Sequence, residues 1–114
     1  MTSKLDEKVG KYIDDYKSKI GDDLDVGLLR KVTQGCGPTI YQRDSETVSG
    51  GDPEEMERVV KNFAMKKLGE TSHDKAMKAV EDALERYGKS NRTKYRAVFY
   101  YLVTKNLGKE SAYN

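Results

Sequence analysis

Residues 90–107 read Ser-Asn-Arg-Thr-Lys-Tyr-Arg-Ala-Val-Phe-Tyr-Tyr-Leu-Val-Thr-Lys-Asn-Leu. At about 100° per residue, Tyr95, Phe99 and Leu102 fall on one stripe of a helix, and further apolar side chains cover much of the remaining circumference. A helix that is apolar nearly all round is expected to be buried on several sides. We therefore predict that this whole segment is one helix and that the other helices pack around it.

The sequence has residues that can begin and end the predicted central helix. Ser90 can act as its N-cap, because a serine hydroxyl accepts a hydrogen bond from a free first-turn amide. Gly108 can close it in the left-handed conformation that glycine adopts readily. We expect residues 109–114 to form a tail whose Tyr113 can dock on the body.

Helical spacing of apolar residues and helix-terminating residues predict four earlier helices. The clearest start is Asp52-Pro53-Glu54-Glu55, which combines a capping Asp, a proline at the first helical position and an acidic first turn. With caps and stops included, these helices run from Ser3 to Gly21, from Leu24 to Gly35, from Asp52 to Gly69 and from Thr71 or Ser72 to Gly88.

The segment between residues 38 and 51 is irregular. Pro38 can open one helical turn that carries Ile40 and Tyr41 inward, and Asp44 or Ser45 can cap another turn that ends at Val48. No segment shows the sustained alternation of a strand. We predict an all-α fold, a single compact domain of about five helices over residues 1–114, with the C-terminal helix central.

The composition is that of a globular protein with many charges. The 114 residues are 36% hydrophobic and 35% charged, against about 25% charged in an average soluble domain. No run of 18 apolar residues and no cleavable leader is apparent, so we expect a cytoplasmic protein that does not enter a membrane.

The charges are unevenly distributed along the chain. Residues 1–57 carry 8 Lys/Arg and 13 Asp/Glu, whereas residues 58–114 carry 13 and 6. Three interpretations stay open: attraction between the two halves of one molecule, head-to-tail association of copies, or a basic surface for an anionic partner.

A basic cluster surrounds the start of the predicted last helix, where free amides and the helix dipole favour an anion. It is a candidate site for phosphate or nucleic acid with little base readout. The alternative is a solvated face, or pairing with acidic residues of the first half. The candidate residues are Lys89, Ser90, Arg92, Lys94 and Arg96.

Other patterns favour structural roles. Residues 83–90 satisfy a relaxed phosphate-loop pattern, but they are expected to form the end of one helix and the cap of the next. The single Cys36 lies far along the chain from the single His73, so a thiol with a neighbouring base is not favoured. The clustered acids lack a calcium-loop spacing, so no metal site is expected. Eight tyrosines are expected to form the core with their hydroxyls at its edge.

Several stretches together resemble a small bacterial family of uncharacterised proteins, one of the families of domains of unknown function. The resemblance spans nearly the whole chain and implies a compact helical fold and a bacterial cytoplasmic setting. It implies no activity, so it supplies no functional residue. The stretches are LLRKVTQGCGPTIY (28–41), TVSGGDP (47–53), NFAMKKLG (62–69), GKSNRTKYRAVFYYL (88–102) and GKESAY (108–113).

The sequence therefore favours a non-enzymatic interaction module. Its partner is unknown, and self-association or another protein would both fit. The alternative is nucleic-acid or phosphate-ligand binding through the basic start of the last helix, which is less favoured. An enzyme is disfavoured, and no cofactor is expected, because no nucleophile with a base, no metal set and no cofactor motif is apparent.

Overall fold

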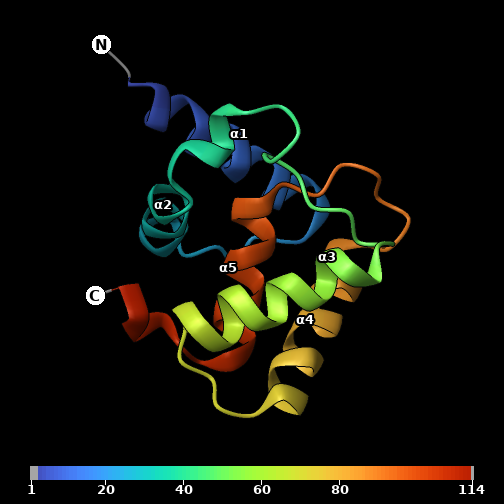
Figure 1. Cartoon of the computed structure of the whole chain (residues 1–114). Coiled ribbons are helices and arrows are strands. Elements are labelled where there is room, and N and C mark those ends of the chain that lie inside the picture. The colour runs from blue at the N-terminus through green and yellow to red at the C-terminus, as the bar shows by residue number, and fades with distance from the viewer. Residues whose placement is uncertain (1–2, 114) are drawn as a thin grey trace.

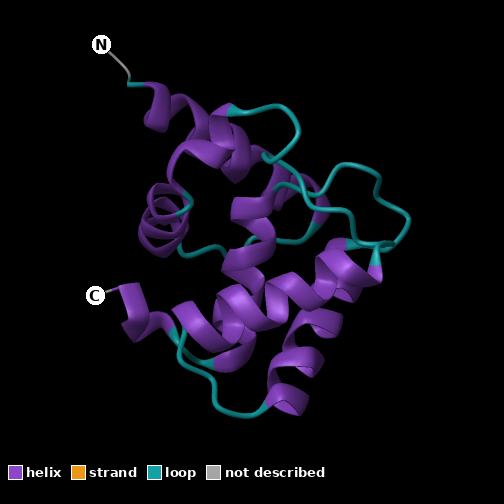
Figure 2. Ribbon diagram, in the orientation of Figure 1, coloured by secondary structure: helices purple, strands orange, loops and turns teal. Residues whose placement is uncertain are grey.

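The computed structural model describes residues 3–113, which form five α-helices and three shorter or irregular helical segments (Figure 1). The all-α prediction is confirmed, and the described residues contain no strand (Figure 2). The elements are α1 (Lys4–Lys19), α2 (Val26–Gly35), η1 (Gly37–Tyr41), α3 (Pro53–Arg58), η2 (Val59–Lys67), α4 (His73–Tyr87), α5 (Arg96–Leu107) and η3 (Glu110–Tyr113).

Helix α5 is the central element, as predicted. It lies between α1 and α2 on one side and η2 and α4 on the other (Figure 1). Its apolar residues face several neighbours at once, which is why the amphipathic pattern of an ordinary surface helix is missing from it. Its buried residues are Ala97, Val98, Phe99, Tyr101, Leu102, Val103 and Thr104.

The start of α5 differs from the prediction, because the helix begins at Arg96 and not after Ser90. The preceding backbone pairs with a distant segment instead of forming another helical turn. The amide of Val48 donates to the carbonyl of Lys94 at 2.8 Å, and the amide of Arg96 donates to the carbonyl of Glu46 at 2.7 Å. These bonds form an isolated antiparallel bridge that leaves residues 88–95 as a loop.

Several other helix ends follow the predicted capping residues, although α2 is capped by Asp25 and not by Leu24. Ser3 and Asp6 form a reciprocal capping box at α1, and Asp52 with Pro53 begins α3. Of the two candidates at α4, Ser72 is the cap. Gly108 closes α5 with a φ of 64°.

One predicted helix is continuous in space but changes its hydrogen bonding. Residues 53–67 form a single rod in Figure 1, with α3 followed directly by η2. The second part is a π-helix, in which, for example, the amide of Leu68 donates to the carbonyl of Phe63 at 2.9 Å. The wider π turn changes which side chains share a face, and a simple 3.6-residue repeat does not anticipate it.

The irregular segment is only partly as expected. Gly37–Tyr41 forms the predicted turn, here a 3₁₀ segment, and Ile40 is buried. The expectation for Tyr41 is wrong, since 46% of this residue is exposed. The predicted turn ending at Val48 is also wrong, because Thr47 forms the bridge to Tyr95 and Val48 is drawn into the core beside it.

The C-terminal tail is ordered as η3, and Tyr113 packs against the core as expected. A Cβ placed on Gly35 would meet the Cε1 atom of Tyr113 at 3.2 Å, so the ring lies directly on the end of α2. Asn114 lies outside the described residues.

Four tyrosines are fully buried and send their hydroxyls to the edge of the core, as predicted. They tie α1, α4 and α5 to loops and acidic side chains. The hydroxyls of Tyr12, Tyr16 and Tyr87 donate to Glu46, Asp23 and Asp15, and the hydroxyl of Tyr101 accepts from the amide of Asp25.

Candidate functional site

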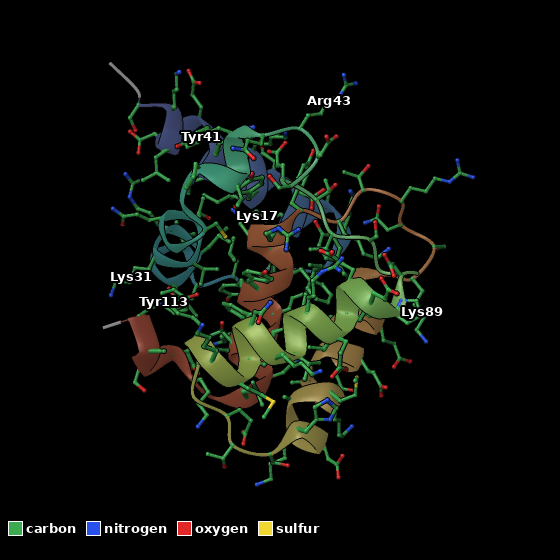
Figure 3. The ribbon with its side chains drawn as sticks, viewed as in Figure 1. Lys17, Lys31, Tyr41, Arg43, Lys89 and Tyr113 are labelled. Atoms are coloured by element: carbon green, nitrogen blue, oxygen red, sulfur yellow. The ribbon has the colours of Figure 1, made fainter. Side chains whose placement is uncertain are left out.

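The residues of the predicted anion site divide between the surface and the interior. Lys89, Ser90 and Arg92 are exposed on the loop between α4 and α5, and Figure 3 shows Lys89 at the periphery. Lys94 is only 5% exposed. Its ammonium group donates to the carbonyl oxygens of Lys89 and Asn91. This lysine therefore holds the loop from within and does not face solvent.

Arg96 is also engaged inside the molecule. Its guanidinium lies 3.0 Å from the carboxylate of Glu55, donates to the carbonyl of Ser45 at 2.7 Å and donates to the hydroxyl of Tyr100 at 2.9 Å. Its backbone amide donates a hydrogen bond to the carbonyl of Glu46. The structure thus groups Lys89, Ser90 and Arg92 on one loop and directs Lys94 and Arg96 elsewhere.

The charge asymmetry is partly resolved by attraction within the molecule. Arg86 pairs with Asp23 at 2.6 Å, and Arg96 pairs with Glu55. Arg58 and Lys61 pair with Glu55 and Glu57, so four Lys/Arg residues of the second half meet acids of the first. Within residues 3–113, Lys89 and Arg92 make no ion pair with an acidic side chain, so their charges remain available to a partner.

Two adjoining hollows lie along one face of η2. The first has a volume of about 220 Å³ and the second about 170 Å³. Both are lined by Asn62 and Tyr100, and together we call them the Tyr100 groove. The first is lined by Gly35, Cys36, Asn62, Phe63, Lys67, Tyr100 and Tyr113, and the second by Glu55, Arg58, Val59, Asn62, Arg96 and Tyr100.

Asn62 stands at the centre of this region. It lies within the π-helix, and it also borders a third hollow of about 300 Å³, which is lined by Glu57 and Lys61 as well. Its exposed amide can both donate and accept hydrogen bonds.

The wall of the Tyr100 groove is aromatic. The rings of Phe63 and Tyr100 stack with centroids 3.9 Å apart. The ammonium of Lys67 lies 5.2 Å from the ring centroid of Tyr113, and the guanidinium carbon of Arg96 lies 5.6 Å from that of Tyr100. Each cation lies over a ring, so the groove combines aromatic surface with positive charge.

In the second hollow, the carboxylate of Glu55 accepts hydrogen bonds from two arginines. Partial burial opposes ionisation of Glu55, but hydrogen bonds from Arg58 and Arg96 outweigh it, so the pKa of Glu55 lies below its ordinary value. Glu55 is therefore ionised at neutral pH and partly neutralises both arginines. Lys67 has no acidic partner among the described side chains, which leaves a positive charge at the other end of the groove.

The thiol in the groove is not activated. Burial raises the pKa of Cys36 to about 11, so the thiol is protonated at neutral pH. His73 does not line the groove, and its Nε2 atom lies 2.8 Å from a carboxylate oxygen of Glu57. Residues 3–113 also gather no set of three side chains able to hold a metal ion. The groove can therefore contact a ligand through apolar surface, hydrogen bonds and positive charge.

Sequence reasoning missed this groove. Tyr100 is one of the eight tyrosines expected to form the core, and one face of its ring indeed packs against Phe63. A sequence signal that could point to the groove is Cys36, which stands between Gly35 and Gly37. The switch to a π-helix around Asn62 carries no sequence signature that we recognise.

The fold and the groove together define a small all-helical protein with two adjoining hollows beside a π-helix. The chain belongs to the family described as proteins of unknown function, DUF2853, which matches residues 11–111. This confirms the resemblance at the level of a family of unknown function. A comparison with curated proteins finds no match. Among the described helices, none combines the length and the apolar character needed to cross a bilayer.

Proposed function

We propose that this protein is a non-enzymatic interaction module that recognises its partner through the Tyr100 groove. The observation that carries this proposal is the position of Asn62, which lies in the π-helix and borders three adjoining hollows. Single π turns within α-helices occur frequently at functional sites.

The chemistry of the groove supports binding in preference to catalysis. Its thiol is protonated, and its one carboxylate is held by two arginines. Neither group is poised to act as a nucleophile or as a general base near neutral pH. The aromatic pair and the exposed amide of Asn62 supply shape, apolar surface and hydrogen bonds, which suit recognition.

The proposal also covers the cellular location of the module and the kind of partner. We place it in the bacterial cytoplasm as a single domain, in keeping with the family resemblance of the sequence. Self-association and a separate partner are both compatible with one groove per chain, and the experiment below distinguishes them.

Site-specific photocrosslinking tests the proposal. The photoreactive residue p-benzoylphenylalanine replaces Asn62 in one variant and the exposed Glu81 of α4 in a control, and adducts formed in cells are weighed by intact-protein mass spectrometry. We expect one dominant adduct at position 62 and none at position 81. Its mass identifies a second copy, another protein or a small molecule. No adduct at position 62, or the same adducts at both positions, would contradict the proposal.

A second candidate function is supported by the anchored loop. Lys94 anchors the loop from within, and Lys89, Ser90 and Arg92 are exposed on it. Two unpaired cations and a hydroxyl on an ordered loop can contact a phosphate group. We propose nucleic-acid or phosphate binding at this loop as the alternative function.

Fluorescence anisotropy with single- and double-stranded oligonucleotides tests the alternative at two salt concentrations. Lys89→Gln combined with Arg92→Gln should weaken binding that falls steeply with salt. The control combines Lys17→Gln with Lys31→Gln, which removes the same charge from exposed positions on α1 and α2 (Figure 3). Equal losses in both double variants, or no binding by the unmodified protein, would exclude the alternative.

A further inference from the structure

The first hollow of the Tyr100 groove has one charged lining residue. Of the side chains around it, Lys67 alone is a cation, and no acidic residue lines the hollow. Burial raises the pKa of the thiol of Cys36 and of the phenols of Tyr100 and Tyr113, so these three groups are neutral near pH 7. The interior is therefore uncharged and its rim is positive.

The apolar part of the hollow is aromatic. Phe63 and Tyr100 are nearly parallel, with 15° between their planes, and Tyr113 lines the same hollow from η3. The volume of about 220 Å³ lies just below the usual range of small-molecule sites and suits a compact ligand. Because Phe63 and Tyr100 cover each other's facing sides, a ligand ring can pack edge-to-face against them and against Tyr113.

The rim provides polar contacts in fixed places. Lys67 closes η2, and its ammonium group lies over the ring of Tyr113 at the edge of the hollow. Asn62 lies about one turn earlier on the same helix and lines the same hollow. A carboxylate can accept hydrogen bonds from both an ammonium and an amide group.

We propose that the first hollow binds a small aromatic carboxylate, with its ring against Phe63, Tyr100 and Tyr113 and its carboxylate at Lys67. Charge complementarity selects this class, because the only lining charge is positive and the rest of the wall is neutral and aromatic. This inference rests on the proposed function and names the ligand class of the same groove.

A matched pair of probes separates the contribution of the carboxylate charge to the affinity from that of the ring. The probes are 2-naphthoate and 2-naphthylmethanol, which share a ring system and differ in carrying a carboxylate or a neutral hydroxymethyl group. Each is titrated into the isotope-labelled full chain, and amide chemical shifts are followed by NMR. We expect saturable shifts at Gly35, Asn62 and Lys67, with about five- to tenfold tighter binding of 2-naphthoate, the size expected for a charge-assisted contact.

Two matched variants test whether the side chain of Lys67 causes the preference for 2-naphthoate. Lys67→Gln should abolish the preference for 2-naphthoate and leave the affinity for 2-naphthylmethanol within about twofold. Lys66→Gln removes the same charge from the neighbouring exposed position, which does not line the hollow, and should retain the preference. The amide spectra of both variants report whether the fold is intact.

Three outcomes would overturn the ligand class. They are an absence of saturable shifts around the hollow, equal affinity for the two probes, and equal loss of preference in both lysine variants. A photocrosslinked adduct at position 62 without probe binding would remove the ligand class and keep the interaction module. The reverse pattern would keep a small-molecule site and remove the module.

Discussion

The rings of Phe63 and Tyr100 stack with centroids 3.9 Å apart and 15° between their planes. Phe63 belongs to η2 and Tyr100 to the central helix α5, so the contact joins the π-helix to the core. The same two rings line the Tyr100 groove. The contact that joins η2 to the core is therefore also part of the proposed binding groove.

Substitutions at Tyr100 should separate its two contributions to stability. Tyr100→Phe keeps the ring but removes the hydroxyl that accepts from Arg96, which should cost about 0.5–1.5 kcal/mol. Tyr100→Leu also removes the stacked ring and should cost about 0.5–1.5 kcal/mol more. Urea unfolding followed by circular dichroism measures both. Equal stabilities of the Phe and Leu variants would show that the stack contributes nothing.

The close approach of Gly35 and Tyr113 predicts a local effect of one methyl group. Gly35→Ala places a Cβ 3.2 Å from the ring of Tyr113, which is tighter than an ordinary contact, so the C-terminal segment should move outward. Hydrogen exchange of residues 109–113 should quicken while the helical core stays protected. Gly51→Ala, where the added Cβ meets no atom within 4 Å, is the control and should leave that exchange unchanged. Unaltered exchange in Gly35→Ala would contradict the prediction.

Substitution of Gly10 by alanine should stabilise the protein. It is an exposed residue in the interior of α1, and a Cβ added there meets no atom within 4 Å. Gly10→Ala should raise the free energy of unfolding by about 0.5–1 kcal/mol, because alanine restricts the unfolded chain and favours the helix. Thermal and urea unfolding check it. A loss of stability would mean that the surface of α1 at Gly10 contacts something in solution, such as a second copy.

The buried ammonium group of Lys94 should hold the loop at residues 88–95. Lys94→Met keeps most of the aliphatic chain but leaves the carbonyls of Lys89 and Asn91 without this donor, at a cost of about 1–3 kcal/mol. Amide exchange across the loop should quicken. Lys89→Met, at the exposed end of the same loop, should change stability by less than about 0.5 kcal/mol. Equal effects of the two variants would remove the anchoring role.

Glu46 should make the protein sensitive to acid. Partial burial opposes its ionisation, but hydrogen bonds from Lys8, Tyr12 and Lys11 outweigh this, so its pKa in the folded protein is below the ordinary 4.5. A carboxyl group with a lowered folded pKa stabilises the fold above pH 4.5, and this contribution is lost as the pH falls through the folded pKa.

Unfolding measured between pH 7 and pH 3 tests this expectation. Glu46→Gln should be less stable than the unmodified protein at pH 7 by about 1–3 kcal/mol. The difference should shrink as the pH falls below 4.5. Glu54→Gln, at an exposed position in the first turn of α3, is the control and should follow the unmodified protein more closely. A constant difference at every pH would contradict the prediction.

Most helices of this protein follow from interactions between residues close in the chain. Ser3, Asp52 and Ser72 accept from amides two or three residues later, and Gly108 closes a helix through its own backbone freedom. Burial of α5 was also predictable, because apolar side chains around its whole circumference need several neighbours. The docking of Tyr113 could be expected from its aromatic ring alone.

Packing between distant segments fixed the remaining features. The bridge between Thr47 and Tyr95 determines where α5 begins, because backbone groups near Lys94 and Arg96 pair across the molecule instead of within another turn. The same packing turns Lys94 inward, pairs Arg96 with Glu55 and places Asn62 at the centre of a groove. A local pattern shows which groups need partners, and only the folded chain brings the distant partners within hydrogen-bonding reach.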